Sequence, residues 1–142
     1  MKQATAYKRK AQLFVHSSSR TTAGVWILGE PCIRLDEACS DLEFGTAVKA
    51  ALDASSSDVP HPRSWAGLLD PLLKLAGVKS WSAFAKTASC VEIEEDGGKV
   101  SIIPTKNLGV RDGFQAERVR AATTHRDALA ELGALMRQML GS

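Results

Sequence analysis

One change in the spacing of apolar residues constrains the fold of this chain more than any other feature. Residues 91–94 alternate strictly between apolar and acidic side chains (Val-Glu-Ile-Glu), and Val100 and Ile102 resume the alternation after Asp96-Gly97-Gly98. A two-residue period on both sides of a glycine turn predicts a β-hairpin with one buried face. The segments before and after this hairpin have a helical period instead, so the fold must combine strands and helices.

The clearest helix signal precedes the hairpin. Ser40-Asp41-Leu42-Glu43 fits a capping box, in which a serine hydroxyl and a glutamate carboxylate satisfy free backbone N–H groups. Apolar residues then recur at helical spacing as far as Ala54. Gly45 lies inside this predicted helix, where glycine costs about 1 kcal/mol relative to alanine, so we expect close packing there.

Three further helices are expected. Ser64 can cap a helix that ends at Gly77, and Pro71 should kink or split it. Ser80 can cap a short helix, and Thr124 can cap the last one. The carboxylate of Asp127 would then lie near the positive N-terminal end of the helix dipole and stabilise that helix. The last helix carries an apolar stripe typical of core packing: Leu129, Leu132, Met136 and Met139.

The remaining strand signals are shorter. Residues 8–15 end in β-forming residues and are followed by Ser17-Ser18-Ser19, which predicts a turn. Residues 24–29 predict a second strand that Pro31 stops, and the two strands form a plausible hairpin. Pro104 should end the 91–102 hairpin. We expect a loop over residues 105–113 and an edge strand over residues 116–122.

Together these elements predict an α+β fold, with an antiparallel sheet of about five strands packed with three or four helices. A chain of 142 residues matches one domain, covering residues 1–142. Its 44% hydrophobic and 24% charged content is typical of a globular protein. No apolar run reaches the roughly 18 residues of a membrane span, and the N-terminus lacks the apolar core of a signal peptide. We therefore expect a cytoplasmic protein that does not bind membranes.

Charge and cysteine content exclude little. The net charge of +2 is too small to indicate nucleic-acid binding by itself. Residues 1–20 are basic, whereas residues 30–58 are acidic, so the two regions can neutralise each other or steer a charged partner. The three cysteines lack C-x-x-C spacing, and we predict no metal site and no cofactor.

The common catalytic motifs are absent from the sequence. The best catalytic set is that of a metal-independent ribonuclease, with His16, His61 and His125 as acid and base and Lys106 or Arg111 as the phosphate-binding cation. Nothing in their spacing indicates that these residues converge. Glu92, Glu94, Glu95 and Asp96 suggest another role, because acidic side chains on a hairpin can form either a solvated surface or a docking patch for a cationic protein.

The ordered set of short motifs resembles the contact-dependent growth inhibition immunity proteins of Gram-negative bacteria, the CdiI family. The similarity extends over roughly residues 7–140 and consists mainly of structural positions. The residues that carry it are Tyr7 with the following basic strand, Asp41-Leu42-Glu43-Phe44-Gly45-x-Ala47-Val48-x-x-Ala51-Leu52, Gly77-Val78-Lys79-Ser80, Phe84-Ala85-Lys86, Val91-x-Ile93, Ile102-Ile103-Pro104-Thr105-Lys106, Gly113-Phe114 and Glu131-Leu132-Gly133-x-Leu135.

The resemblance implies a binding protein and not an enzyme. Its expected partner is the toxic C-terminal domain of a cognate CdiA effector, often a nuclease that cleaves transfer RNA, held in a stoichiometric complex. No direct contact with nucleic acid is expected. The predicted toxin-binding residues are surface acids outside the shared motifs: Asp36, Glu37, Glu92, Glu94, Glu95 and Asp96. Trp26, Trp65 and Trp81 are candidate hot spots if exposed, although we expect each to be buried. The alternative function is a small RNA-binding protein or ribonuclease that uses Lys8-Arg9-Lys10 and the basic residues between Arg111 and Arg126.

Overall fold

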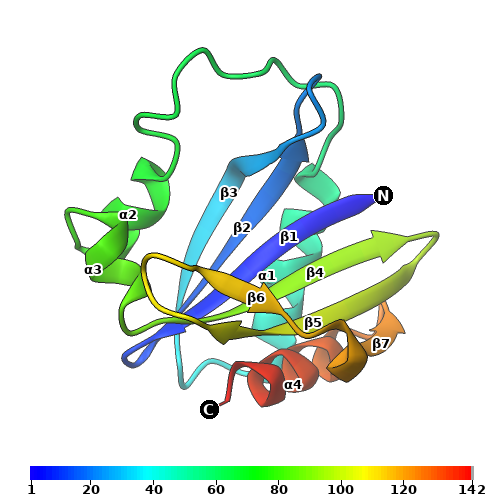
Figure 1. Cartoon of the computed structure of the whole chain (residues 1–142). Helices are drawn as coiled ribbons and strands as arrows, with labels where there is room; N and C mark the ends of the chain where they lie inside the picture. Colours follow the sequence, from blue (N-terminus) through cyan, green and yellow to red (C-terminus); the bar gives the residue numbers. More distant parts are fainter. Residues whose placement is uncertain (142) are drawn as a thin grey trace.

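A computed structural model describes residues 1–141 and shows one mixed α+β architecture. All strands of the sheet are antiparallel, and their order is β3-β2-β1-β4-β5-β6, with β7 pairing on β5 beside β6 (Figure 1). The strands are β1 (Lys2–Arg9), β2 (Gln12–Arg20), β3 (Trp26–Asp36), β4 (Ser89–Asp96), β5 (Lys99–Asn107), β6 (Phe114–Ala116) and β7 (Ala122–His125). The helices are α1 (Asp41–Ala54), α2 (Asp70–Ala76), α3 (Trp81–Ala85) and α4 (Leu129–Leu140). The predicted fold class is confirmed, with seven strands in place of about five in the part of the chain described.

The two faces of the sheet are covered differently. Helices α1 and α4 pack together on one side of the sheet, over inward-facing residues such as Ala4, Val15 and Ile93; in Figure 1, α1 passes behind the central strands and α4 lies along the β5 and β7 edge. We call this side the covered face. Helices α2 and α3 cover only one corner of the other side, where Tyr7 and Phe84 centre an aromatic cluster with ring centroids 5.2 Å apart. No helix among residues 1–141 is long and apolar enough to cross a membrane.

Glycines set the distance between α1 and α4. A methyl group added at Gly45 would overlap the backbone carbonyl oxygen of Leu129, and one added at Gly133 would overlap that of Asp41. The two backbones therefore touch where the helices cross. The close packing predicted at Gly45 is confirmed, and Gly133 supplies the other half of the contact.

The N-terminal strands differ from the prediction. Residues 2–9 form the central strand β1, which the sequence reasoning missed because its lysines and alanines are poor β-formers. The predicted turn at Ser17-Ser18-Ser19 is wrong, since these serines are buried in β2. The second serine triplet explains this: the Ser55 hydroxyl donates to the Ser18 carbonyl, and the Arg20 N–H donates to the Ser56 carbonyl at 2.9 Å. These contacts between β2 and the segment after α1 satisfy backbone polar groups that would otherwise need solvent, so this part of the chain can lie buried in a strand.

Prolines do not end the strands as predicted. Pro31 lies within β3, at a register shift where Glu30 and Pro31 are left out of the pairing between His16–Cys32 and Ser17–Gly29. Pro104 lies within β5, which continues to Asn107 and takes part of the predicted 105–113 loop. Proline has no backbone N–H to donate to a neighbouring strand. Pro31 is tolerated because it lies at a bulge, and Pro104 because its position in the register requires no donor.

The C-terminal third contains two further corrections. The predicted edge strand over residues 116–122 is interrupted by a 3-10 helix, Arg118–Arg120, between β6 and β7. Thr124 lies in β7 and caps no helix, because α4 begins five residues later with Ala128 at its N-cap. The apolar stripe of α4 is confirmed, with Leu132 and Met136 fully buried.

Helix boundaries in the middle of the chain were only partly predicted. Ser40 forms the predicted capping box of α1, Ser80 caps α3, and Gly77 ends α2 in a left-handed conformation. Ser64 caps nothing, since α2 begins at Asp70 and Pro71 occupies its first turn without kinking it. Trp65 is therefore placed in the segment before α2.

Candidate functional site: the open face of the sheet

Polar side chains line the part of the sheet that faces away from α1 and α4 and that α2 and α3 leave uncovered. Thr5 of β1 pairs with His16 of β2 on one side and with Glu92 of β4 on the other. One step along, Gln3 lies between Ser18 and Glu94 in the same way. We call this surface, formed by Gln3, Thr5, His16, Ser18, Glu92 and Glu94, the open face. The strand period alone places these six residues on one side of the sheet.

A pocket of about 250 Å³ lies over the open face. Its polar floor includes Thr5, His16 and Ser18, and its apolar wall includes Leu28 and Leu69. A second, apolar pocket of about 280 Å³ shares Trp26, Ile27, Leu28 and Leu69 with the first and is bounded by Trp65 and Leu68. The two pockets therefore form one concave surface between β3 and the segment that precedes α2.

His16 is a buried and neutral part of this pocket. Its side chain is only 4% exposed, and its Nδ1 lies 2.8 Å from the Ser17 carbonyl oxygen, which can only accept a hydrogen bond. Nδ1 must therefore carry the proton, and Nε2 accepts from the Tyr7 hydroxyl at 3.5 Å. Burial lowers the pKa of His16, although the bond to the Ser17 carbonyl opposes that change. Burial likewise raises the pKa of Tyr7 well above its usual value. Neither group is charged near neutral pH.

Glu92 is the charged side chain of this pocket. It is half-buried, and within residues 1–141 its carboxylate has no hydrogen-bond or ion-pair partner. Desolvation raises the pKa of Glu92; the positive charge of Arg118 lowers it, and the negative charge of Glu94 raises it further. A partly desolvated carboxylate without a counter-ion destabilises the fold and marks a candidate binding group.

The neighbouring carboxylate is neutralised. Arg118, from the 3-10 helix, donates both terminal nitrogens to the two carboxylate oxygens of Glu94, at 3.1 Å each. This hydrogen-bonded pairing raises the pKa of the guanidinium. Because Arg118 is committed to Glu94, it leaves Glu92 without a direct partner.

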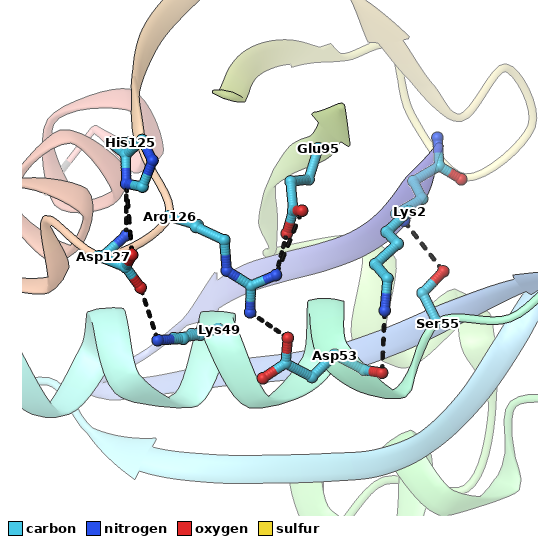
Figure 2. Close-up of polar contacts among 9 residues, drawn as sticks. Lys2, Lys49, Asp53, Ser55, Glu95, His125, Arg126 and Asp127 are labelled. Carbon is cyan, nitrogen blue, oxygen red and sulfur yellow. Dashed lines mark hydrogen bonds and ion pairs between the residues drawn. The ribbon is translucent and has the colours of Figure 1, made fainter. Parts of the chain in front are cut away.

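The covered face has a polar network of a different kind, shown in Figure 2. Arg126 lies between Glu95 of β4 and Asp53 of α1 and is bonded to both, with an Nη1–Oε1 distance of 3.1 Å to Glu95. Lys49 of α1 binds Asp127 at 2.8 Å, and this bond lowers the pKa of Asp127. These contacts join α1, β4 and the segment after β7, so their function is to hold elements together.

Comparison with known proteins identifies the protein family. A family model described as "CdiI: CDI immunity protein" matches residues 2–141. The chain belongs to the CdiI family. Membership confirms the resemblance found in the sequence and the expectation that the protein acts by binding and not as an enzyme.

Two solved structures share the fold of this CdiI family member. A protein of unknown function from Neisseria meningitidis is 19% identical, with a TM-score of 0.79, and the alignment covers 98% of this chain and 93% of that one. A chain of the "CdiA-CT/CdiI toxin and immunity complex" from Yersinia pseudotuberculosis is 16% identical, with a TM-score of 0.78, and the alignment covers 98% of this chain and 94% of that one. No protein of curated function matches the sequence.

The six acids predicted to bind the toxin do not form one cluster in this CdiI protein. Asp36 ends β3 and Glu37 follows it at one end of the sheet, whereas Glu95 and Asp96 lie at the other end, roughly 20 Å away along the strands. Glu37 binds Lys8 at 2.9 Å, and Glu95 is buried against Arg126. Asp36 and Asp96 are exposed, and Glu92 and Glu94 lie on the open face.

The structure does not assemble the alternative ribonuclease site. His16 is on the open face, His61 is held by the Thr21 hydroxyl at 2.9 Å, and His125 lies beside Asp127 near the β4–β5 turn. The expected burial of Trp65 is wrong: its side chain is 57% exposed, while Trp26 and Trp81 are half-buried.

Sequence reasoning missed Gln3 and Thr5 as members of the site because β1 was not recognised as a strand, and it missed Ser18 because a turn was predicted there; His16 was named only for the ribonuclease alternative. The alternation of Gln3, Thr5 and Tyr7 with Ala4 and Ala6 was the available signal.

Proposed function

We propose that this protein is the cytoplasmic immunity protein of a contact-dependent growth inhibition system, which binds the toxic C-terminal domain of its cognate CdiA effector one to one. The match of the CdiI family model to residues 2–141 carries this proposal. The fold that the chain shares with a component of the Yersinia pseudotuberculosis toxin and immunity complex supports it at the level of architecture.

The surface of the molecule supports binding of a cationic partner. Glu92 on the open face and the exposed carboxylates of Asp36 and Asp96 are available to positive groups, and the remaining predicted acids lie beside them. Enzymes that cleave nucleic acids have cationic surfaces, because they must bind phosphates. We therefore propose that the neutralised toxin is a nuclease, including one that cleaves transfer RNA. Of the six acids, Asp36, Glu37, Glu92, Glu94 and Asp96 are candidates for direct contact with it, whereas Glu95 is held by Arg126 and would act only through its charge.

Titration calorimetry against a catalytically inactive form of the toxin domain encoded beside this protein tests the proposal. We expect one-to-one binding with a dissociation constant of about 1 nM or lower, as in other tight inhibitor complexes. Incubating active toxin with bulk transfer RNA, with and without an equimolar amount of this protein, then tests nuclease inhibition. Absence of binding to the toxin domain would overturn the proposed function, whereas binding to a toxin that leaves RNA intact would overturn only the nuclease assignment.

The RNA-binding alternative has its own measurement. A filter-binding assay of this protein alone with labelled transfer RNA, at low and at physiological salt, should show no retention beyond that of an unrelated protein of equal charge. Salt-sensitive retention would favour the alternative, because direct phosphate contacts weaken steeply with salt.

A further inference from the structure

The pocket on the open face combines three features that together specify the chemistry of one occupant. It contains one carboxylate without a counter-ion, a floor of neutral hydrogen-bonding groups and a wall of apolar side chains. Each feature has a separate structural cause.

The charge of the pocket comes from Glu92 alone. His16 and Tyr7 face the same space, but burial keeps His16 unprotonated and Tyr7 in its phenol form. Cys90, on the same strand as Glu92, is also kept in its neutral thiol form by burial. The nearest charged neighbours, Glu94 and Arg118, neutralise each other. A positive group entering the pocket therefore meets the carboxylate of Glu92, which feels the charge of Arg118 but forms no ion pair with it.

The walls accept a long side chain with a polar end. Leu28 and Leu69 offer apolar surface for a methylene stem, and Trp26 offers an aromatic ring on which a planar cation can stack. Thr5, Ser18 and Gln3 provide oxygen acceptors for the N–H groups that the carboxylate does not bind. A guanidinium group fits this combination better than an ammonium group, because its planar fork pairs with a carboxylate and stacks on a ring at the same time.

The pocket opens onto a surface that a protein can cover. It shares four residues with the neighbouring apolar pocket, whose outer boundary is the 57%-exposed Trp65. Tryptophan is enriched among the residues that contribute most of the binding energy at protein interfaces. This continuity favours a side chain presented by a folded partner over a free small molecule.

We propose that the pocket receives one arginine or lysine side chain of the toxin domain, and that Glu92 is its ion-pair partner. The inference rests on the proposed function and adds to it a specific contact and the chemistry of the toxin residue. It also explains why the protein keeps a carboxylate that the fold itself leaves without a partner.

The first test compares Glu92→Gln with the matched control Glu131→Gln in calorimetry against the inactive toxin domain. Both variants remove one negative charge, but Glu131 is exposed on α4, on the covered side of the sheet. Glu92→Gln should weaken binding about 30-fold or more, because the cation in the complex loses its counter-ion. Glu131→Gln should bind as the unchanged protein does. Circular dichroism melting curves verify that both variants fold.

The second test locates the toxin residue. Each arginine and lysine of the toxin domain is replaced by methionine, and its effect is measured with the unchanged protein and with Glu92→Gln. One substitution should lose its effect in the Glu92→Gln background, since the two changes remove the same ion pair. No such coupling at any cationic toxin residue would overturn the inference.

The third test measures the number of protons released when the complex forms. A positive partner lowers the pKa of Glu92, so complex formation in the acidic range should release protons from the unchanged protein and fewer from Glu92→Gln. Calorimetry in buffers of different ionisation enthalpy measures this difference. If the unchanged protein does not bind the toxin at all, the proposed function fails; if it binds and Glu92→Gln binds equally well, only this inference fails.

Discussion

The two faces of one sheet handle charge in opposite ways. On the covered face, the carboxylates of Glu95 and Asp53 converge on Arg126, and the α1–α4 crossing is so close that only glycine fits at Gly45 and Gly133. On the open face, Glu92 has no partner among the described residues, and a pocket lies above it. A fold needs satisfied groups and tight packing. Substitutions on the covered face should therefore change stability. Substitutions at the unpaired carboxylate and the pocket of the open face should change binding.

The largest effect should come from the helix crossing. Gly133→Ala places a methyl group on the carbonyl oxygen of Asp41, and we expect a loss of about 3 kcal/mol or more in the free energy of unfolding. The same change in an unobstructed helix would stabilise by about 1 kcal/mol, so even the sign is informative. Urea denaturation measures it, with Ala134→Ser on the exposed side of α4 as a control within about 0.5 kcal/mol. A stabilised Gly133→Ala would mean that the two helices do not touch backbone to backbone.

The next effect tests the polar network of the covered face. Arg126→Leu leaves the buried Glu95 without its cation, and we expect the free energy of unfolding to fall by about 3 kcal/mol. Adding Glu95→Gln to Arg126→Leu should restore part of the loss, because the uncompensated charge is then gone. Arg120→Gln, which breaks the exposed pair with Glu117, is the control and should change stability by less than about 1 kcal/mol. Equal effects at Arg126 and Arg120 would contradict the structural role assigned to the network.

The smallest expected change in stability is at Glu92 on the open face, and there the substitution should stabilise the fold. The pKa of Glu92 is raised in the folded protein, so the charged carboxylate destabilises the fold at pH values above that pKa. Below the unfolded value near 4.5, both states are protonated and the penalty disappears. Glu92→Gln should therefore raise the melting temperature at pH 7, by the equivalent of less than about 1 kcal/mol because the group is half-exposed, and leave it unchanged at pH 3. Melting curves at both pH values measure the difference, and a destabilised Glu92→Gln at pH 7 would indicate a partner within the fold.

Local signals predicted the elements whose cause is local. The Ser40 capping box, the end of α2 at Gly77 and the 91–102 hairpin each depend on residues within a few positions, and all three are present. Close packing at Gly45 could also be predicted, because glycine inside a helix is unfavourable unless another part of the chain packs closely against it. Its contact with α4, more than eighty residues away, was not visible in the sequence.

Errors arose where a distant segment changed the meaning of a residue. Ser17-Ser18-Ser19 suggest a turn in isolation, but the segment after α1 bonds the Ser18 carbonyl and the Ser19 hydroxyl, and the three serines lie buried in a strand. Glu95 belongs to an acidic run in the sequence, yet it faces Arg126 on the covered face while Glu92 and Glu94 face the other way. Alternation predicted that these residues differ in direction, and only the packing of α1 and α4 against the sheet decided which direction is buried.

The sequence by itself determined the fold class, the family and the presence of an acidic hairpin, because periodicity, capping and short motifs are properties of neighbouring residues. Tertiary structure decided which acids have partners, since a counter-ion can come from any part of the chain. Glu95 pairs with Arg126 and Glu94 pairs with Arg118, whereas Glu92 has no ion-pair partner within residues 1–141. That distribution, fixed by how α1, β4 and the 3-10 helix meet in space, distinguishes the charges that hold the protein together from the one left for a partner.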